Sequence, residues 1–144
     1  VSADEIFRGI SSDSIDRIVA LTEREGVVIL KLGKLGDSGN LETSDLRTMA
    51  ATIVQNLGQV VRAVTDKSSL DVLVVIGGDT SSGVLEACGV RSLELQGELQ
   101  PGTVSGVPVG GSIAGKLLVT RAGGFGDEKS LLELVSMLQF GHGV

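Results

Sequence analysis

The sequence predicts a three-layer, Rossmann-like α/β domain in which helices cover both faces of a mostly parallel sheet. Apolar residues make up 42% of the 144-residue chain, which has no Trp or Tyr and only three Phe. Its core must therefore be aliphatic, as is typical of buried parallel strands. Short apolar runs also alternate with amphipathic segments, which is the order expected when helices connect parallel strands. The length fits a single domain with its own core, and no linker divides the chain.

The first part of the chain predicts two helices with a short strand between them. Apolar residues in Ser11–Glu25 recur at helical spacing, and Gly26 is a favourable helix end. The continuous apolar run Val27–Leu32 predicts a buried strand. The glycine-containing segment 31–40 follows; it could close over a ligand, but a simple turn of the chain is favoured. The longest helix is predicted at Ser44–Val64, where one apolar stripe runs along the helix.

The second part of the chain predicts more strands, separated by short helices and glycine-rich loops. Four strands are expected: Asp71–Ile76, Ser92–Leu95, one near Val107–Val109, and Lys116–Arg121. Two helices are expected at Thr80–Cys88 and Asp127–Leu138, the second with Asp127 as a plausible N-cap. The rest of segment 96–115 is rich in Gly and Pro, and we expect it to form loops.

Composition excludes several classes of function. The net charge is −6, whereas nucleic-acid binding needs a basic surface and often stacking aromatic rings. No apolar run is long enough to span a membrane, and no secretory signal is visible, so we expect a cytoplasmic protein. Cys88 is the only cysteine, so it cannot form an internal disulfide, and no residues have the spacing of metal ligands.

The sharpest candidate site follows the predicted strand Asp71–Ile76. Gly77 and Gly78 carry no side chains, so backbone amides there could approach a phosphate, and the next helix adds free amides and a partial positive charge. Thr80, Ser81 and Ser82 add hydroxyl groups, and Asp79 could hold a magnesium ion through its water shell. The chain has no GxxxxGK[ST] or GxGxxG motif. An ordinary tight turn with good helix-capping residues would have the same sequence. Residue spacing alone does not decide between such a turn and a phosphate site.

A second candidate site follows the strand Lys116–Arg121. Gly123, Gly124 and Gly126 form another glycine cluster at a strand end, and Arg121 at the exit could meet a phosphate. Two such turns on one sheet can line the same crevice, because ligands of α/β sheets sit at the carboxyl ends of strands. Phe125 could touch an adenine ring, but a plug that fills the core beneath the loop is favoured.

Three segments in order resemble the C-terminal nucleotide-binding domain of the four-carbon acid sugar kinase family. They are GGDTSSGVLEACGV, LELQGELQPGTVSGVPVGG and LLVTRAGGFGDEKSLLEL. The resemblance implies a two-domain kinase that uses ATP and Mg²⁺ to phosphorylate small sugar acids such as threonate, erythronate or 3-oxo-tetronate. In this family the N-terminal domain holds the sugar acid. Carried over to this chain, the nucleotide-binding residues are Gly77, Gly78, Asp79, Thr80, Ser81, Gly123 and, less directly, Gly124.

The chain also departs from the family pattern. Arg121 stands where the family commonly has Lys, and the guanidinium offers a different donor geometry. The sugar-acid domain and the serine-containing strand-turn that opens the nucleotide domain are not in the sequence, so we expect residues 1–144 to be the C-terminal part of a larger kinase. No catalytic residue can be assigned, and a homodimer stays open. The alternatives are a nucleotide-binding module without activity and an effector or interaction protein that has kept the fold.

Overall fold

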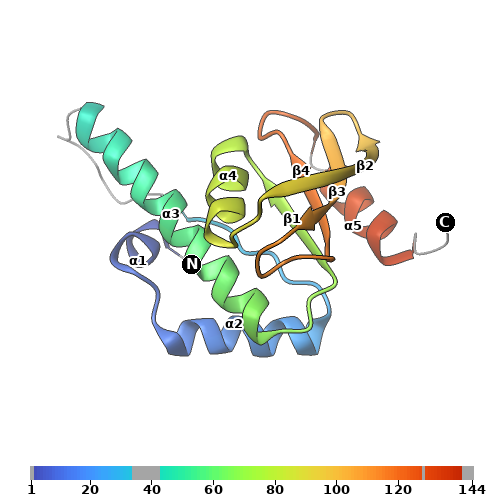
Figure 1. The fold of residues 1–144 in the computed structure, drawn as a ribbon. Coiled ribbons are helices and arrows are strands. Elements are labelled where there is room, and N and C mark those ends of the chain that lie inside the picture. Colours follow the sequence, from blue (N-terminus) through green and yellow to red (C-terminus); the bar gives the residue numbers. More distant parts are fainter. Residues whose placement is uncertain (1, 34–42, 128, 141–144) are drawn as a thin grey trace.

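The computed structural model describes residues 2–33, 43–127 and 129–140. Within these residues the chain forms five helices and four strands (Figure 1). The helices are α1 Ala3–Arg8, α2 Ser12–Glu25, α3 Thr43–Lys67, α4 Gly78–Ala87 and α5 Ser130–Phe140. The strands are β1 Val72–Ile76, β2 Ser92–Gln100, β3 Thr103–Val109 and β4 Leu117–Arg121. All of the helices expected from the sequence are confirmed, with ends that differ by a few residues.

The sheet is mixed, so the prediction of a mostly parallel sheet is wrong. Its strand order is β1-β4-β3-β2, in which β1 and β4 are parallel. The β4–β3 and β3–β2 pairs are antiparallel. The physical reason is that β2 and β3 are joined by a hairpin instead of a helical crossover, and a two-residue connection can only reverse the chain.

The hairpin occupies most of the segment that we expected to form loops. Gln100 pairs with Thr103, so Pro101 and Gly102 form its turn. A proline followed by a glycine with φ of +71° is the pattern of a type II turn. Register shifts near Gly97 mark bulges in β2, which is where a glycine within a strand is commonly found. The glycines and prolines therefore mark turns and bulges of a hairpin, not the absence of strands.

Helices α3 and α4 cross very closely beside β1. A Cβ added to Gly58 in α3 would lie 2.9 Å from the carbonyl carbon of Gly83 in α4. Two glycines therefore let the helix backbones touch, and α4 in turn packs on β1. The core between these elements is aliphatic, and its fully buried side chains include Val84 and Leu118.

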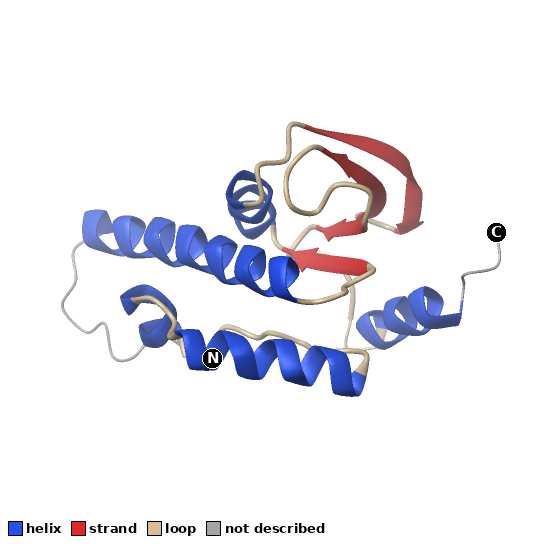
Figure 2. Cartoon of the chain, turned by 60° about the horizontal axis from the view of Figure 1, so that its bottom comes forward, coloured by secondary structure: helices blue, strands red, loops and turns tan. Residues whose placement is uncertain are grey.

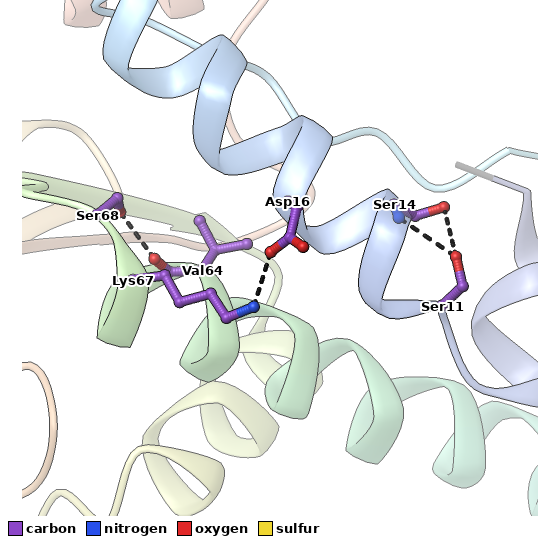
Figure 3. Close-up of polar contacts among 6 residues, drawn as sticks. All are labelled: Ser11, Ser14, Asp16, Val64, Lys67 and Ser68. Atoms are coloured by element: carbon purple, nitrogen blue, oxygen red, sulfur yellow. Dashed lines mark hydrogen bonds and ion pairs between the residues drawn. The ribbon is translucent and has the colours of Figure 1, made fainter.

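Helices α1 and α2 pack on α3 and form a second core there. Ile6, Ile53 and Val60 are buried in this cluster. Figure 2 shows α2 running alongside α3, and an ion pair of 2.7 Å joins Lys67 of α3 to Asp16 of α2 (Figure 3). These helices therefore support α3 from the side that faces away from α4.

The apolar run Val27–Leu32 does not form the strand that we predicted. It has no strand partner among the described residues, and Ile29 is 66% exposed. Leu30 instead packs against the helical core of α1 and α3. A strand needs a neighbour to satisfy its backbone groups, and hydrophobicity alone could not show that this neighbour is lacking here.

Helix α5 lies on the opposite side of the sheet from α4 (Figure 1). The carboxylate of Asp127 accepts hydrogen bonds from the backbone amides of Lys129 and Ser130, at 3.1 and 2.9 Å. The predicted N-cap role of Asp127 is therefore confirmed, and Leu134 anchors the helix with a fully buried side chain. None of the helices in the described part of the chain is long and apolar enough to cross a membrane.

Candidate functional site

The two glycine turns lie next to each other at one edge of the sheet. They follow β1 and β4, which are parallel neighbours with Ile76 opposite Arg121. The amide of Gly77 donates a hydrogen bond of 2.8 Å to the carbonyl oxygen of Arg121. A Cβ added to Gly123 would lie 3.7 Å from the Cα of Gly77. The pairing of the strands therefore brings both turns into direct contact.

The first turn leads straight into the N-terminus of α4. Gly77 has φ of +107°, which favours glycine, and the helix begins at Gly78 without any side-chain cap. The first amides of a helix have no acceptor within the helix itself. Those of Gly78, Asp79 and Thr80 are thus free to bind an anion, and the helix dipole adds a partial positive charge there.

The second turn also presents free amides. The amide of Phe125 donates to the carbonyl oxygen of Ala122 at 3.1 Å and closes the turn. The amides of Gly123 and Gly124 have no acceptor among the described residues, and both glycines are exposed. This turn therefore adds two more donors beside the start of α4.

The space above the two turns is open. No described residue lies within 4 Å of a Cβ added to Gly78 or to Gly124, and neither glycine has a positive φ. Their lack of side chains is therefore not required by packing or by backbone conformation. A ligand that approaches the backbone closely would require the lack of side chains at both positions. Phosphate binding by backbone amides needs such space, which a Cβ atom would fill.

The polar side chains of the first turn divide into two groups. The hydroxyl of Ser81 donates to the carbonyl oxygen of Gly77 at 2.8 Å, so it stabilises the turn and is not a free donor. Asp79 is exposed, Thr80 is half-buried and Ser82 is exposed. No cluster of three or more potential metal ligands exists among the described residues. Asp79 could therefore hold a divalent ion only together with water and oxygens of the ligand.

Arg121 does not extend from the strand exit into the open space. It is 6% exposed, and its Nη2 atom donates a hydrogen bond of 2.6 Å to Oγ of Ser130. The guanidinium lies directly beneath Gly126, where any Cβ would overlap it. Arg121 is thus part of the support of the second turn and not an exposed phosphate ligand.

Phe125 is not the core plug that we favoured, because the residue is 52% exposed. Its ring lies against the hairpin turn, with a ring carbon 2.6 Å from the position of a Cβ on Gly102. The carbonyl oxygen of Gly102 also accepts a hydrogen bond from the amide of Ala122 at 3.1 Å. The sequence reasoning missed this third turn at the site, although the dipeptide Pro101-Gly102 is itself a turn signal.

Cys88 does not join the site. Cys88 is 2% exposed, and burial raises the pKa of its thiol above the ordinary value; it is a small core residue and not a nucleophile. The glycines at 36 and 39, in the segment for which closure over a ligand was considered, lie outside the described residues.

The comparison with known families agrees with this geometry. Residues 4–131 match the nucleotide-binding C-terminal domain family. The chain belongs to this family. The resemblance that three sequence segments indicated is thereby confirmed, and the glycine turns belong to a domain that binds nucleotides.

Two relatives of this chain are D-threonate kinases. The Bordetella bronchiseptica enzyme is 30% identical over 90 residues, which are 62% of this chain and 22% of that enzyme. The Salmonella typhimurium enzyme is 28% identical over 85 residues, or 59% of this chain and 20% of that enzyme. The chain therefore spans about a fifth of the length of these kinases.

Solved structures show the same fold. A domain of unknown function from Bordetella bronchiseptica, crystallised with bound citrate as a domain-swapped dimer, matches with a TM-score of 0.64 and 25% identity. The match covers 87% of this chain and 30% of that one. A Haemophilus influenzae protein matches with a TM-score of 0.62 over 95% of this chain and 33% of its own. Its 13% identity supports the fold alone.

Proposed function

We propose that residues 1–144 form the ATP-binding domain of a larger two-domain kinase. This kinase transfers a phosphoryl group from ATP to a hydroxyl of a four-carbon sugar acid of the threonate, erythronate or 3-oxo-tetronate type. The chain by itself binds ATP and Mg²⁺ without turnover, because the sugar acid is held mainly by the other domain. The proposal rests on the two D-threonate kinases among the relatives and on the contact between the two glycine turns.

That contact is the observation that carries the nucleotide part of the proposal. Five amides without an acceptor among the described residues, those of Gly78, Asp79, Thr80, Gly123 and Gly124, lie on the two touching turns at the carboxyl ends of two parallel strands. Backbone amides hold phosphate oxygens without adding a charge that must be desolvated. Phosphoryl transfer in turn depends mainly on positioning and on stabilising charge.

Magnesium would be held chiefly by the phosphates, with Asp79 as its contact on the protein. The exposed carboxylate stands in the first turn of α4, beside the free amides. A magnesium ion usually keeps several waters and is held by one or two carboxylates plus substrate phosphates. When bound, it neutralises charge that develops on the phosphates. The role of this chain is to orient the nucleotide, and the acceptor hydroxyl must come from the other domain.

A single substitution, Gly78→Val, tests the cradle. The new side chain meets no protein atom at its Cβ, so the fold should be kept while the open space is filled. Loss of one or two hydrogen bonds to charged phosphates, each worth about 1.5–3 kcal/mol, should weaken ATP binding at least about tenfold. Isothermal titration of the chain with ATP and magnesium measures this change.

Ser12→Val is the matched control. Ser12 is the first residue of α2, as Gly78 is of α4, and it is also exposed. We expect Ser12→Val to bind ATP as the unchanged chain does. Equal affinity of the Gly78→Val and Ser12→Val chains would contradict the cradle. Kinase activity is tested on the full-length parent with a panel of four-carbon acids, where a lack of ATP consumption with every acid would contradict the sugar-acid assignment.

A further inference from the structure

Arg121 is a buried cation that forms no ion pair with any other described residue. The residue is 6% exposed, and none of the ion pairs found among the described residues includes it. Its Nε atom is buried and has no hydrogen-bond partner. A buried charge usually has a partner, because burial removes the water that would otherwise stabilise it. The protein therefore carries an unfavourable group directly beneath the second glycine turn.

The neighbourhood increases this positive potential. The Nη2 atom donates to Ser130, which is the first residue of α5, so the guanidinium points at the positive end of a helix dipole. The Ser130 hydroxyl in turn donates to the carbonyl oxygen of Asp127 at 2.7 Å. The Asp127 carboxylate accepts from the first amides of α5, and it offsets part of the dipole without pairing with Arg121.

The same contacts fix the shape of the turn. The guanidinium fills the space beneath Gly126, which has φ of +89°. Its hydrogen bond to Ser130 joins the end of β4 to the start of α5. The turn with the Gly123 and Gly124 amides lies between these two points. The position of those amides therefore depends on where the Arg121 side chain lies.

We propose that Arg121 is a positioning residue of the nucleotide site. Its charge, which no described acidic side chain pairs with, acts together with the start of α5 and makes the second turn favour nucleotides with more phosphates. It acts through the turn and does not contact the ligand. The inference rests on the proposed nucleotide function and adds the reason for selectivity between a triphosphate and a monophosphate. A bound polyphosphate brings negative charge close to this group.

The test measures the ratio of ATP affinity to AMP affinity in the chain and its variants. Arg121→Met, which removes the charge and keeps much of the volume, should lower this ratio about tenfold, because the charge that favours the additional phosphates is lost. Arg121→Lys restores the charge and should keep most of the ratio. Arg91→Met is the matched control, because Arg91 also packs against a positive-φ glycine, Gly110, away from both glycine turns.

A merely structural role of Arg121 would lower both affinities together or change only the melting temperature, and either result would overturn the inference. If Arg121→Met does not fold, Ser130→Ala removes the acceptor of the same contact; a selective loss of ATP affinity would support the inference, and equal changes would overturn it. A chain that binds neither nucleotide refutes the proposed function itself. If Gly78→Val weakens ATP binding but Arg121→Met keeps the ratio of ATP affinity to AMP affinity of the unchanged chain, only the role of Arg121 is refuted.

Discussion

The crossing of α3 and α4 makes a sharp prediction about stability. Gly58→Ala adds a methyl group that would lie 2.9 Å from the carbonyl carbon of Gly83 and 3.0 Å from Cβ of Ala87. Ordinary van der Waals contact begins at 3.4 Å, and the carbonyl oxygen of Gly83 would lie nearer still to the added methyl group, so α4 must move away by roughly 1 Å. The obstacle is helix backbone, which cannot rotate aside as a side chain can.

Two effects of opposite sign determine the magnitude. Replacing a helical glycine by alanine favours the helix by about 1 kcal/mol. Overpacking a well-packed contact costs about 1–3 kcal/mol, and the clash with backbone belongs at the upper end of this range. The net loss should therefore be about 1–2 kcal/mol, which in a domain of this size lowers the melting temperature by roughly 3–10 °C.

Urea and thermal unfolding, followed by circular dichroism, measure the effect. Gln59→Ala is the matched control, since Gln59 is the next residue of α3 and is exposed; its effect should stay within about 0.5 kcal/mol. A Gly58→Ala chain as stable as the unchanged one would refute the close crossing. The helices would then be further apart, and the start of α4 would be less firmly placed beside the second turn than the geometry requires.

Three further predictions concern stability. Leu118→Ala removes a side chain that is 1% exposed and should cost about 2–5 kcal/mol in urea unfolding; a smaller loss would mean that the core beside α4 is loosely packed. Because the Cys88 pKa is raised above its ordinary value of 9.0, its stabilising effect is full below that pH and is lost as pH rises further. Denaturation midpoints should thus fall more steeply in this alkaline range for the unchanged chain than for Cys88→Ala, and parallel curves would contradict a buried thiol. Lys67→Ala breaks an exposed ion pair with Asp16 and should cost less than about 1 kcal/mol, with little effect left at high salt.

The helices could be predicted from the sequence because their signals are local. The apolar stripe of α3, the N-cap at Asp127 and the stop at Gly26 each act within one or two turns of the chain. The observed ends of α2 agree closely with the prediction for the same reason. The glycine turns at 77–78 and 123–124 could likewise be found, since an apolar run followed by glycines is visible in the letters alone.

The strand pairing could not be predicted, because pairing depends on residues far apart in the chain. The run Val27–Leu32 has the composition of a strand but no neighbour among the described residues. The segment 96–115 has the composition of a loop, yet it forms most of a hairpin in which Gly97 and Gly102 have specific backbone roles. Composition indicates whether a segment prefers a strand or a loop, whereas strand pairing depends on which other segments lie close enough to form hydrogen bonds with it.

The burial of Arg121 could not be predicted from the sequence either, because it also depends on contacts between residues. From the sequence it is a charged residue at a strand exit, where an exposed side chain is the usual outcome. Its actual position depends on Gly126 leaving space and on Ser130 offering an acceptor. Gly126 and Ser130 both follow Arg121 closely in the chain. The sequence pattern nevertheless does not show that the turn folds back over the Arg121 side chain.

The wrong prediction of a mostly parallel sheet does not affect the candidate site, because the site depends on one strand pair only. Whether β2 and β3 run parallel or antiparallel does not affect the ends of β1 and β4, which point the same way and leave the sheet at the same edge. Ligands of α/β sheets bind at such carboxyl ends. The parallel pair is also the pair whose strands are both followed by exposed glycine turns, at Gly78 and Gly124. Local geometry at that edge, more than the overall order of strands, is what makes a phosphate site physically reasonable in this chain.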